Sequence, residues 1–270
     1  MRKIFLLVFF LCFFLLNVNK NNILAKQINY GEDKIISRAQ VAKMLCFAYL
    51  TKKEIFDLYQ TRNINFKDVS QTKWYDKYIN AVCARKLMSG VSENNFNPEQ
   101  PLTVLQAQYL LEKISNIKIK VTQDNQDKNI SYYLWTKLFR DAIKNLDSQI
   151  TQKKIIVLAT HDENQNIPEN FIVTNQDYFS CDDLDFKFID KFINIITKDK
   201  EIIAITSYDD EFELKNCKII NQSENKIYLD CGKLKRYFNY NNKNQEKIIF
   251  DQADLKIKSG EIIKIINIKK

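Results

Sequence analysis

The chain has 270 residues and a mass of 32.0 kDa, with 45% hydrophobic and 27% charged residues but only 4 Gly and 3 Pro. This composition is enough for one or two packed domains, and it excludes wholesale disorder, collagen-like repeats and a polytopic membrane protein. A single histidine argues against catalytic triads and histidine-based zinc sites. The formal charge is +8, and beyond Ala25 the basic residues still outnumber the acidic ones, a mild excess that suits an anionic neighbour.

Residues 1–25 have the order of regions found in a secretory signal. Two basic residues precede an unbroken apolar run over residues 4–16, and a polar stretch then leads to Ala25. The run is shorter than the roughly 20 residues that a spanning helix needs, so we predict cleavage after Ala25 instead of a permanent anchor. Lipidation at Cys12 is the weaker alternative, because no small residues precede it. We therefore expect an exported protein.

Two segments, which begin at Ser37 and at Thr103, form an internal repeat and predict capped helices of the same design. Ser37 with Gln40, and Thr103 with Gln106, have the spacing of a capping box, in which the hydroxyl and the Gln side chain satisfy two backbone amides at the helix start. Behind each cap the apolar residues recur at i, i+3, i+4 and i+7, which gives each helix one stripe toward a core. These residues are Val41, Met44, Leu45 and Ala48 in the first helix, and Ala107, Leu110, Leu111 and Ile114 in the second.

A further amphipathic helix is predicted between the two caps, from about Lys73 to Lys86, because apolar residues at 75, 78, 79 and 82 repeat the same spacing. One full unit is thus a helix, a loop and a capped helix. The leading helix of the first unit would fall within the export signal, and no third unit is visible after Ile114. We therefore expect one and a half units over residues 26–116.

These segments resemble the S-layer homology (SLH) repeat of bacterial surface proteins over about residues 29–115. The resemblance rests on Phe66-x-Asp68-Val69, Trp74-Tyr75, Gly90, Phe96-x-Pro98 and Leu102-Thr103, together with Ile36-Ser37-Arg38-Ala39-Gln40, which is similar to the family's Ile-Thr-Arg-Ala-Glu signature. It implies attachment to the cell wall. In that family three repeats usually form a three-fold helical prism, whose grooves hold an anionic, often pyruvylated, wall polysaccharide.

Position by position, the resemblance implies that Arg38 binds the polymer, that Trp74 is the wall-binding aromatic residue, and that Gln40 belongs to the same polysaccharide-binding set. An arginine can hold a carboxylate or phosphate with two parallel hydrogen bonds. The second unit departs from the family, since it has Val104 in place of the arginine and Lys86 where a glycine is usual. At most one groove, between Arg38 and Trp74, then keeps the family's chemistry. The alternative is that Trp74 is a core residue and Arg38 a solvated first-turn residue.

The remaining chain predicts a linker, a connecting helix and a β-rich domain, so the fold class is α+β. Residues 117–130 are polar and lack periodicity, and residues 131–150 contain an amphipathic helix with Ser131 as its cap. Residues 151–270 have short β-branched runs typical of a mainly antiparallel β domain. Two similar hairpins are expected at 196–205 and 256–265, with a meander between them. This part resembles, weakly, the non-catalytic region of stage II sporulation protein D and amidase-enhancer type proteins.

The sequence offers no group of residues that predicts catalysis or a cofactor. Five cysteines remain after the leader, without the spacing of a metal site, and we favour free thiols, with a Cys217–Cys231 disulfide across neighbouring strands as the alternative. No nucleophile has a nearby base, and four scattered glycines cannot form a phosphate loop. We expect no enzyme activity, no cofactor or metal, and no nucleic-acid partner.

These observations favour a secreted, non-catalytic envelope protein that docks on an anionic secondary cell-wall polysaccharide of a Gram-positive bacterium. The β domain would then be available to contact another envelope protein. The alternative is a truncated relative or accessory subunit of a peptidoglycan-processing enzyme, in which the repeats serve only as scaffold.

Overall fold

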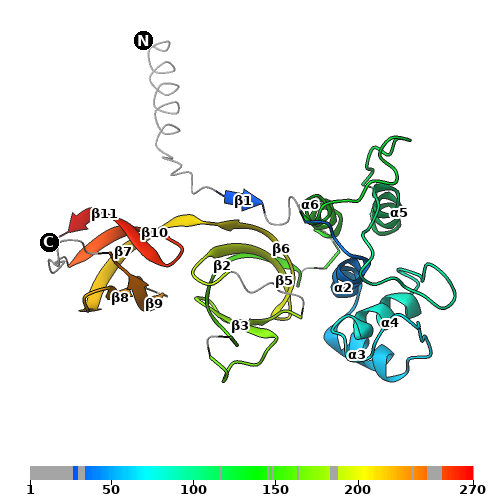
Figure 1. Ribbon diagram of the computed structural model, residues 1–270, viewed down its shortest axis with the longest axis horizontal. Helices are drawn as coiled ribbons and strands as arrows, with labels where there is room; N and C mark the ends of the chain where they lie inside the picture. The colour runs from blue at the N-terminus through cyan, green and yellow to red at the C-terminus, as the bar shows by residue number, and fades with distance from the viewer. Residues whose placement is uncertain are drawn as a thin grey trace, which may run out of the picture.

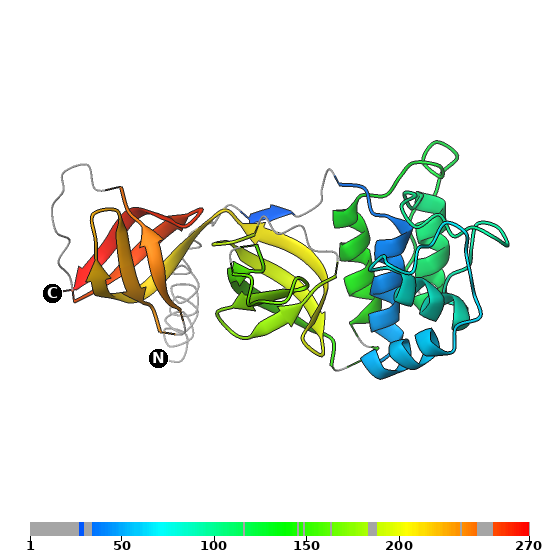
Figure 2. The same cartoon turned by 60° about the horizontal axis from the view of Figure 1, so that its bottom comes forward.

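A computed structural model describes residues 27–29, 34–115, 117–144, 146–147, 149–162, 164–182, 188–232, 234–241 and 251–269. The predicted export signal lies outside the described residues. Three units follow one another along the molecule (Figures 1 and 2): a helical unit (residues 34–143), a first barrel (151–209) and a second barrel (211–269). The expected α+β class, with helices first and mainly antiparallel strands after them, is confirmed.

The described part of the helical unit contains five helices, namely α2 (Arg38–Tyr49), α3 (Lys52–Gln60), α4 (Asp76–Ala84), α5 (Val104–Ile114) and α6 (Tyr132–Ile143). Both predicted capping boxes are confirmed. At the start of α2, the amide of Ser37 donates to Gln40 Oε1 at 3.1 Å, and the amide of Gln40 donates to Ser37 Oγ at 3.3 Å. Ser131 caps α6 through the amide of Leu134. The helix predicted between the two caps is α4, and it begins at Asp76, slightly later than expected.

Helix α3 is not predicted by the sequence pattern. It starts at a third capping box, in which the amide of Thr51 donates to Glu54 Oε2 at 2.9 Å and the amide of Glu54 donates to Thr51 Oγ1 at 3.2 Å. Only Ile55 of this helix is buried. The helix therefore lacks the wide apolar stripe that makes a helix visible in a sequence.

A ring of backbone hydrogen bonds joins the starts of α2, α5 and α6. The residues that precede the three caps are Ile36, Leu102 and Ile130, and all three are buried. The amide of Leu102 donates to the carbonyl of Ile36 at 3.1 Å, that of Ile130 to Leu102 at 2.9 Å, and that of Ile36 to Ile130 at 3.3 Å. The bonds close on themselves, so three helices are arranged with approximate three-fold symmetry.

A second set of three bonds repeats this symmetry one layer away. The first residue of each helix donates its amide to a carbonyl just before the next cap: Arg38 to Gln100 at 3.0 Å, Val104 to Lys128 at 2.9 Å, and Tyr132 to Lys34 at 2.6 Å. Helix α6 therefore takes the third position of the prism, where the sequence shows no third unit. The polar stretch predicted as a linker runs against the start of α5, through Lys128 and through Gln126, whose carbonyl accepts from the amide of Leu105.

The β region forms two closed barrels where one β domain was expected. The first contains β2 (Thr151–Thr160), β3 (Phe171–Thr174), β4 (Tyr178–Ser180), β5 (Phe192–Lys198) and β6 (Glu201–Asp209). The second contains β7 (Glu211–Gln222), β8 (Lys226–Asp230), β9 (Lys235–Asn239), β10 (Gln252–Lys258) and β11 (Glu261–Lys269). In addition, β1 (Gln27–Asn29) pairs with β6 outside the first barrel.

The two barrels have the same topology. In each, the first strand pairs antiparallel with the second and with the fourth, the second with the third, and the fourth with the fifth. A single parallel bridge between the third and fifth strands then closes the barrel, Ser180 with Glu201 in the first and Asn239 with Glu261 in the second. One constant offset along the sequence relates the starts of β2, β5 and β6 to those of β7, β10 and β11. The two predicted hairpins are confirmed, and they belong to a larger tandem repeat.

The first barrel docks on the helical unit through the turn of its hairpin. Lys198 Nζ donates to the carbonyls of Phe47 and Leu50 at 3.2 and 3.1 Å, at the C-terminus of α2, and forms an ion pair with Asp147 at 2.8 Å. The last carbonyls of a helix have no partner within the helix, and the helix dipole favours a cation there. Lys198 is 3% exposed, so this contact is buried.

The second barrel docks on the first through the corresponding hairpin turn. A Cβ on Gly260, whose φ is +79°, would collide with the carboxylate of Asp190 of the first barrel. Asp190 also forms an ion pair with Arg236 of β9, and the rings of Phe192 and Phe212 meet edge to face across the junction at 4.7 Å. Each hairpin turn therefore contacts the unit that precedes it in the chain.

Cys217 and Cys231 form a disulfide, and the expectation of free thiols is wrong for this pair. Cys217 lies on β7 and Cys231 follows β8, its pairing partner, so the two side chains meet between neighbouring strands. The other cysteines of the described chain, Cys46, Cys83 and Cys181, are free.

Candidate functional site

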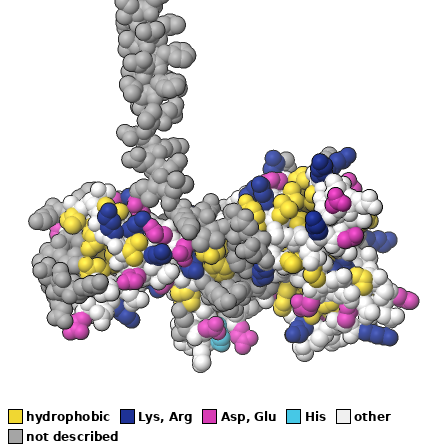
Figure 3. All heavy atoms as spheres, turned by 45° about the horizontal axis from the view of Figure 1, so that its top comes forward, with side chains coloured by type: hydrophobic (Ala, Val, Ile, Leu, Met, Phe, Trp, Pro, Cys, Tyr) yellow, Lys and Arg dark blue, Asp and Glu magenta, His cyan; other side chains and the backbone are white. Residues whose placement is uncertain are grey.

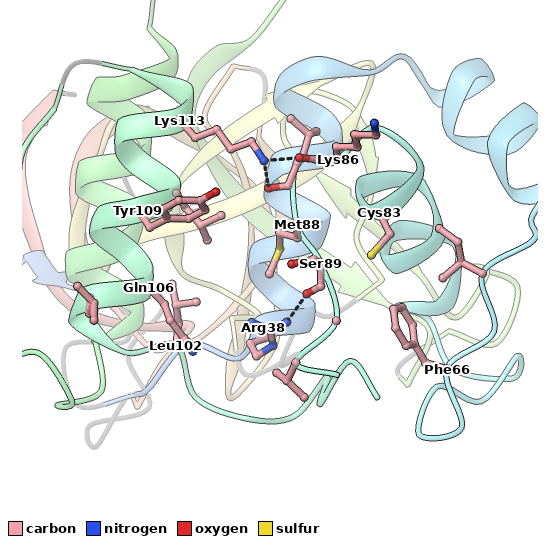
Figure 4. A pocket seen from close by; sticks show the side chains of 16 residues that line it. Arg38, Phe66, Cys83, Lys86, Met88, Ser89, Leu102, Gln106, Tyr109 and Lys113 are labelled. Atoms are coloured by element: carbon pink, nitrogen blue, oxygen red, sulfur yellow. Dashed lines mark hydrogen bonds between the residues drawn. The ribbon is translucent and has the colours of Figure 1, made fainter. Parts of the chain in front are cut away.

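A pocket of about 930 Å³ lies in the helical unit. Its walls come from the start of α2, the end of α4 with the loop that follows it, and the exposed side of α5 (Figure 4). The residues that its chemistry depends on are Arg38, Cys83, Lys86, Leu105, Tyr109 and Lys113.

The lining carries three cations, Arg38, Lys86 and Lys113, and no acid. Burial raises the pKa of Cys83 to about 11, so this side chain is a neutral thiol at pH 7 and adds no negative charge. In the described part of the chain, no group of three or more His, Cys, Asp or Glu side chains could hold a metal ion. The pocket therefore attracts anions.

Arg38 is the deepest of the three cations and is 6% exposed. Its Nε donates to the carbonyl of Phe96 at 2.9 Å, its Nη2 donates to the carbonyl of Ser89 at 2.8 Å, and its guanidinium lies 4.6 Å from the centre of the Phe96 ring. Both hydrogen bonds go to neutral carbonyls, and no carboxylate of the described residues lies within ion-pair distance of the guanidinium. Burial lowers the pKa of Arg38, but a guanidinium stays charged in proteins.

The loop that holds Arg38 is fixed by two motif residues. Asp68 accepts hydrogen bonds from the amides of Phe96 and Asn97 at 3.0 and 2.6 Å, which positions the Phe96 carbonyl beside Arg38. Gly90 has no room for a side chain, since a Cβ would lie 2.6 Å from the Phe66 ring. These contacts explain in physical terms why an Asp and a Gly stand at these two positions.

Lys86 and Lys113 line the upper part of the pocket (Figure 4). Lys86 follows α4 with a φ of 57°, in the left-handed region where a glycine is favoured. Lys113 Nζ donates to the carbonyl of Lys86 and, at 3.4 Å, to that of Leu87. Both lysines are exposed, so they are available to a ligand at the mouth of the pocket.

One wall of the pocket is apolar and open to solvent. Tyr109 is 65% exposed, and Leu105, one turn earlier on α5, is also exposed. Side chains four residues apart lie on the same face of a helix, so the two form a continuous surface. An aromatic ring beside cations suits a ligand that has both an apolar face and negative charge.

The three residues singled out from the sequence lie apart. Arg38 lines the pocket, and the alternative that it is a solvated residue does not hold. Trp74 is half-buried against the core, where its ring meets those of Tyr75 and Tyr78 at 5.3 and 6.2 Å, and it does not line the pocket. The side chain of Gln40 is used in the cap of α2.

Sequence reasoning misses Lys86, Tyr109 and Lys113 as site residues. Lys86 stands out in the sequence only as a departure from the family, although its charge is a signal for the site. The signal at Tyr109 is its position opposite the buried stripe of α5, where an exposed apolar residue next to Leu105 needs an explanation.

A three-fold helical prism with a cationic groove has the features of a docking module for an anionic ligand. The comparison with protein families identifies the module, since the S-layer homology domain matches residues 65–103, which include α4, the loop that follows it and the cap of α5. The chain therefore carries an S-layer homology domain, and this domain implies association with the cell surface or wall. No curated protein matches the chain. Among the helices that the structure describes, none is long and apolar enough to cross a membrane.

Proposed function

We propose that the helical unit anchors the exported protein to the cell wall by binding an anionic wall polysaccharide in the pocket around Arg38. The observation that carries this proposal is a buried guanidinium with no ion-pair partner among the described residues. A buried charge is costly unless it is paired. A carboxylate or phosphate of the polymer would supply the missing partner, and an arginine can bind such a group with two hydrogen bonds.

The remaining groups of the pocket suit the same ligand. Lys86 and Lys113 add positive charge at the mouth, which draws an anionic polymer toward the groove. The exposed ring of Tyr109 can pack on the apolar face of a sugar. This set replaces Trp74 as the aromatic partner of Arg38 in our proposal.

The three-fold symmetry supports one such groove in the chain. The positions that match Arg38 at the starts of the other two helices are Val104 and Tyr132, and neither is cationic. One groove gives monovalent and therefore weak binding. Firm attachment would need several copies of the protein bound together to one polymer chain.

A secreted and non-catalytic role is the second part of the proposal. A disulfide between Cys217 and Cys231 suits an oxidising compartment outside the cytoplasm. The only histidine, His161, contacts the carbonyl of Ile167 through Nδ1 at 2.5 Å, and no hydrogen bond to a hydroxyl or thiol is seen for it among the described residues. The barrels would then serve as the part of the molecule that meets other envelope proteins.

The test is co-sedimentation of the chain lacking residues 1–25 with purified cell-wall sacculi, before and after chemical removal of the wall polysaccharide. We expect binding that needs the polysaccharide and that falls about tenfold or more in Arg38→Ala. Tyr109→Ala and Lys113→Met change only exposed side chains and should also weaken binding. Tyr178→Ala, an exposed tyrosine on the first barrel, is the matched control and should bind normally.

Binding to stripped sacculi, or equal binding by the wild type and all pocket variants, would contradict the proposal. Capture of a peptidoglycan hydrolase by the barrels, without wall binding, would instead favour an accessory subunit with the helical unit as scaffold.

A further inference from the structure

A second cleft, of about 310 Å³, lies where the helical unit meets the first barrel. The helical unit contributes residues from α2, α3 and the start of α4, and the first barrel contributes residues from β3, β4, β6 and the segments that flank β3 and β4. This junction cleft is separate from the pocket around Arg38, since the two share no lining residue. Figure 3 shows the helical unit and the first barrel as adjacent lobes.

Aromatic side chains from both units line the junction cleft. Phe56 is 59% exposed on α3, and Tyr59 of the same helix and Phe171 of the first barrel line the cleft with it. Three aromatic side chains from two units around one cleft form a surface on which the apolar face of a flat ring can pack.

The polar side chains that line the junction cleft are held in place by hydrogen bonds and ion pairs. The carboxylate of Asp182 receives Lys77 Nζ at 2.7 Å, the hydroxyl of Tyr78 at 2.7 Å and Asn170 Nδ2 at 3.3 Å. Burial opposes ionisation of Asp182, but the hydrogen bonds from Lys77 and Tyr78 outweigh it and hold its pKa below the ordinary value. Asp182 is therefore a carboxylate at pH 7, and it fixes the ammonium of Lys77 at the cleft.

Glu201 plays the same part for a second lysine. Its carboxylate is buried, lies 3.5 Å from Nζ of Lys43 and 3.5 Å from Nζ of Lys52, and accepts a hydrogen bond from Ser180 Oγ. The side chain of Lys52 is 45% exposed, and that of Lys77 is 42% exposed. Asp182 and Glu201 line the cleft as well, but their side chains are only 8% and 5% exposed, so the ammonium groups of the two lysines are the charged atoms most open to a ligand.

We infer that the junction cleft binds a short acidic saccharide. Its ring would pack on Phe56 and Phe171, and its carboxylate would meet the ammonium groups of Lys52 and Lys77. An uncharged apolar ligand would leave both ammonium groups without new partners. A saccharide presents an apolar ring face and oxygen acceptors together, which is the combination that the cleft offers.

The test is titration of the chain lacking residues 1–25 with N-acetylmuramic acid, followed by isothermal titration calorimetry and by the backbone amide signals of α3 and β3. N-acetylglucosamine, which lacks the lactyl carboxylate, is the matched probe. We expect saturable binding of the acid and about tenfold weaker binding of the uncharged sugar.

Two exposed variants test the site itself. Phe56→Ala and Lys52→Met should each weaken binding of the acid about fivefold or more. Phe56→Ala should keep the melting temperature of the wild type, whereas Lys52→Met removes one of the two ion pairs of the buried Glu201 carboxylate and should lower it. Lys53→Met, the neighbouring lysine, whose side chain is 81% exposed and outside the cleft, should bind as the wild type does. Tyr109→Ala should also leave this titration unchanged, so failure here is separate from failure of wall anchoring. No saturable binding, or equal binding of both sugars, would overturn the inference.

Discussion

Lys86 combines two properties that oppose each other at one position. Its φ of 57° places it in the left-handed region, which costs a residue with a Cβ about 1 kcal/mol compared with glycine. Its side chain lines the pocket around Arg38. The chain therefore has a strained lysine where the family usually has a glycine. The positive charge that Lys86 adds to the pocket offers a reason for this residue despite the strain.

We expect Lys86→Gly to raise the free energy of unfolding by about 1 kcal/mol, because the strain is relieved, and to weaken binding of the wall polymer, because one cation is lost. Urea denaturation and co-sedimentation measure the two effects. Lys113→Met removes a cation without a change in backbone strain, so it should weaken binding and give no gain in stability. A destabilised Lys86→Gly would contradict this account of the position.

The lowered pKa of Asp182 predicts that the stability of the fold depends on pH in the acidic range. Its pKa is lower in the folded protein than in the unfolded chain, so its carboxylate stabilises the fold above its ordinary pKa of 3.8 and this contribution is lost as the pH falls through the folded value. Glu201 has the opposite sign: burial raises its pKa, so its ionisation costs stability as the pH rises above 4.5.

We therefore expect Asp182→Asn to flatten the fall in stability between about pH 5 and about pH 3. Melting temperatures at a series of pH values give the slope. Asp199→Asn, on the exposed hairpin turn of the first barrel, is the control and should keep the slope of the wild type. The same steep slope in Asp182→Asn would show that other carboxylates dominate.

The tandem hairpins supply a matched pair of lysines at the scale of elements. Lys198 and Lys258 hold the same position in the two barrels, directly before the turn and opposite Glu201 and Glu261. Lys198 is buried and satisfies carbonyls at the end of α2, whereas Lys258 is exposed. A comparison of the two lysines therefore separates the stability that comes from docking on α2 from the stability that the lysine gives to the hairpin itself.

We expect Lys198→Met to lower the free energy of unfolding by about 3 kcal/mol, because two carbonyls and Asp147 lose a buried cation. Lys258→Met should change it by less than about 0.5 kcal/mol. Guanidinium denaturation of the two variants measures the difference. Similar losses in both would mean that the lysine acts within the hairpin and not through α2.

Much of the helical unit follows from local sequence, and the rest depends on distant contacts. Caps at Ser37, Thr103 and Ser131 can be predicted because each is a short-range pattern followed by an apolar stripe. The position of α6 as the third helix of the prism cannot be predicted from the repeat. Ser131 follows Thr103 much more closely than Thr103 follows Ser37, and no leading helix lies between Thr103 and Ser131 in the described residues. Helix α6 joins the prism through the backbone hydrogen bond from the amide of Ile130 to the carbonyl of Leu102, and no local sequence pattern predicts this bond.

The barrels show the same limit. The hairpins at the ends of the two barrels are visible as Glu-Ile-Ile-x-Ile after a polar turn, but closure depends on pairing of the first strand with the fourth and on one parallel bridge. Such pairings join strands that are distant in the sequence. The alternating pattern of side chains in these strands is compatible with several pairing registers, so it does not select one. At the candidate site, Arg38 is predicted from a motif, whereas Tyr109 and Lys113 need the packing of α5 to reveal their common face.

Charge is distributed unevenly over the whole molecule. Residues 211–270 contain 13 Lys and Arg against 8 Asp and Glu, whereas residues 26–210 contain 25 of each. The net positive charge of residues 26–270 therefore lies in the second barrel, at the end farthest along the chain from the pocket. The second barrel therefore adds a general attraction to an anionic surface, whereas the proposed specific contact is made by the pocket around Arg38.

The disulfide predicts how the second barrel responds to reduction. Cys217 and Cys231 have a sequence separation of 14, and a cross-link around a loop of this size stabilises a fold by about 3 kcal/mol. We expect a reductant to lower the urea midpoint that the amide NMR signals of β8 and β9 report, while the fluorescence of the tryptophans in the helical unit shows no shift. A variant with both cysteines changed to serine should match the reduced protein, and a shift in the tryptophan signal would contradict a local effect.

The ring of Ile36, Leu102 and Ile130 has a consequence for the timing of folding. The bond between Ile36 and Ile130 joins the first cap of the helical unit to the last, so the prism cannot close until the chain as far as α6 is present. Contacts of such long sequence separation form slowly. If the chain is threaded across a membrane from its N-terminus, the prism would stay open during transfer and close only after α6 has emerged, so this topology would delay folding until transfer is nearly complete.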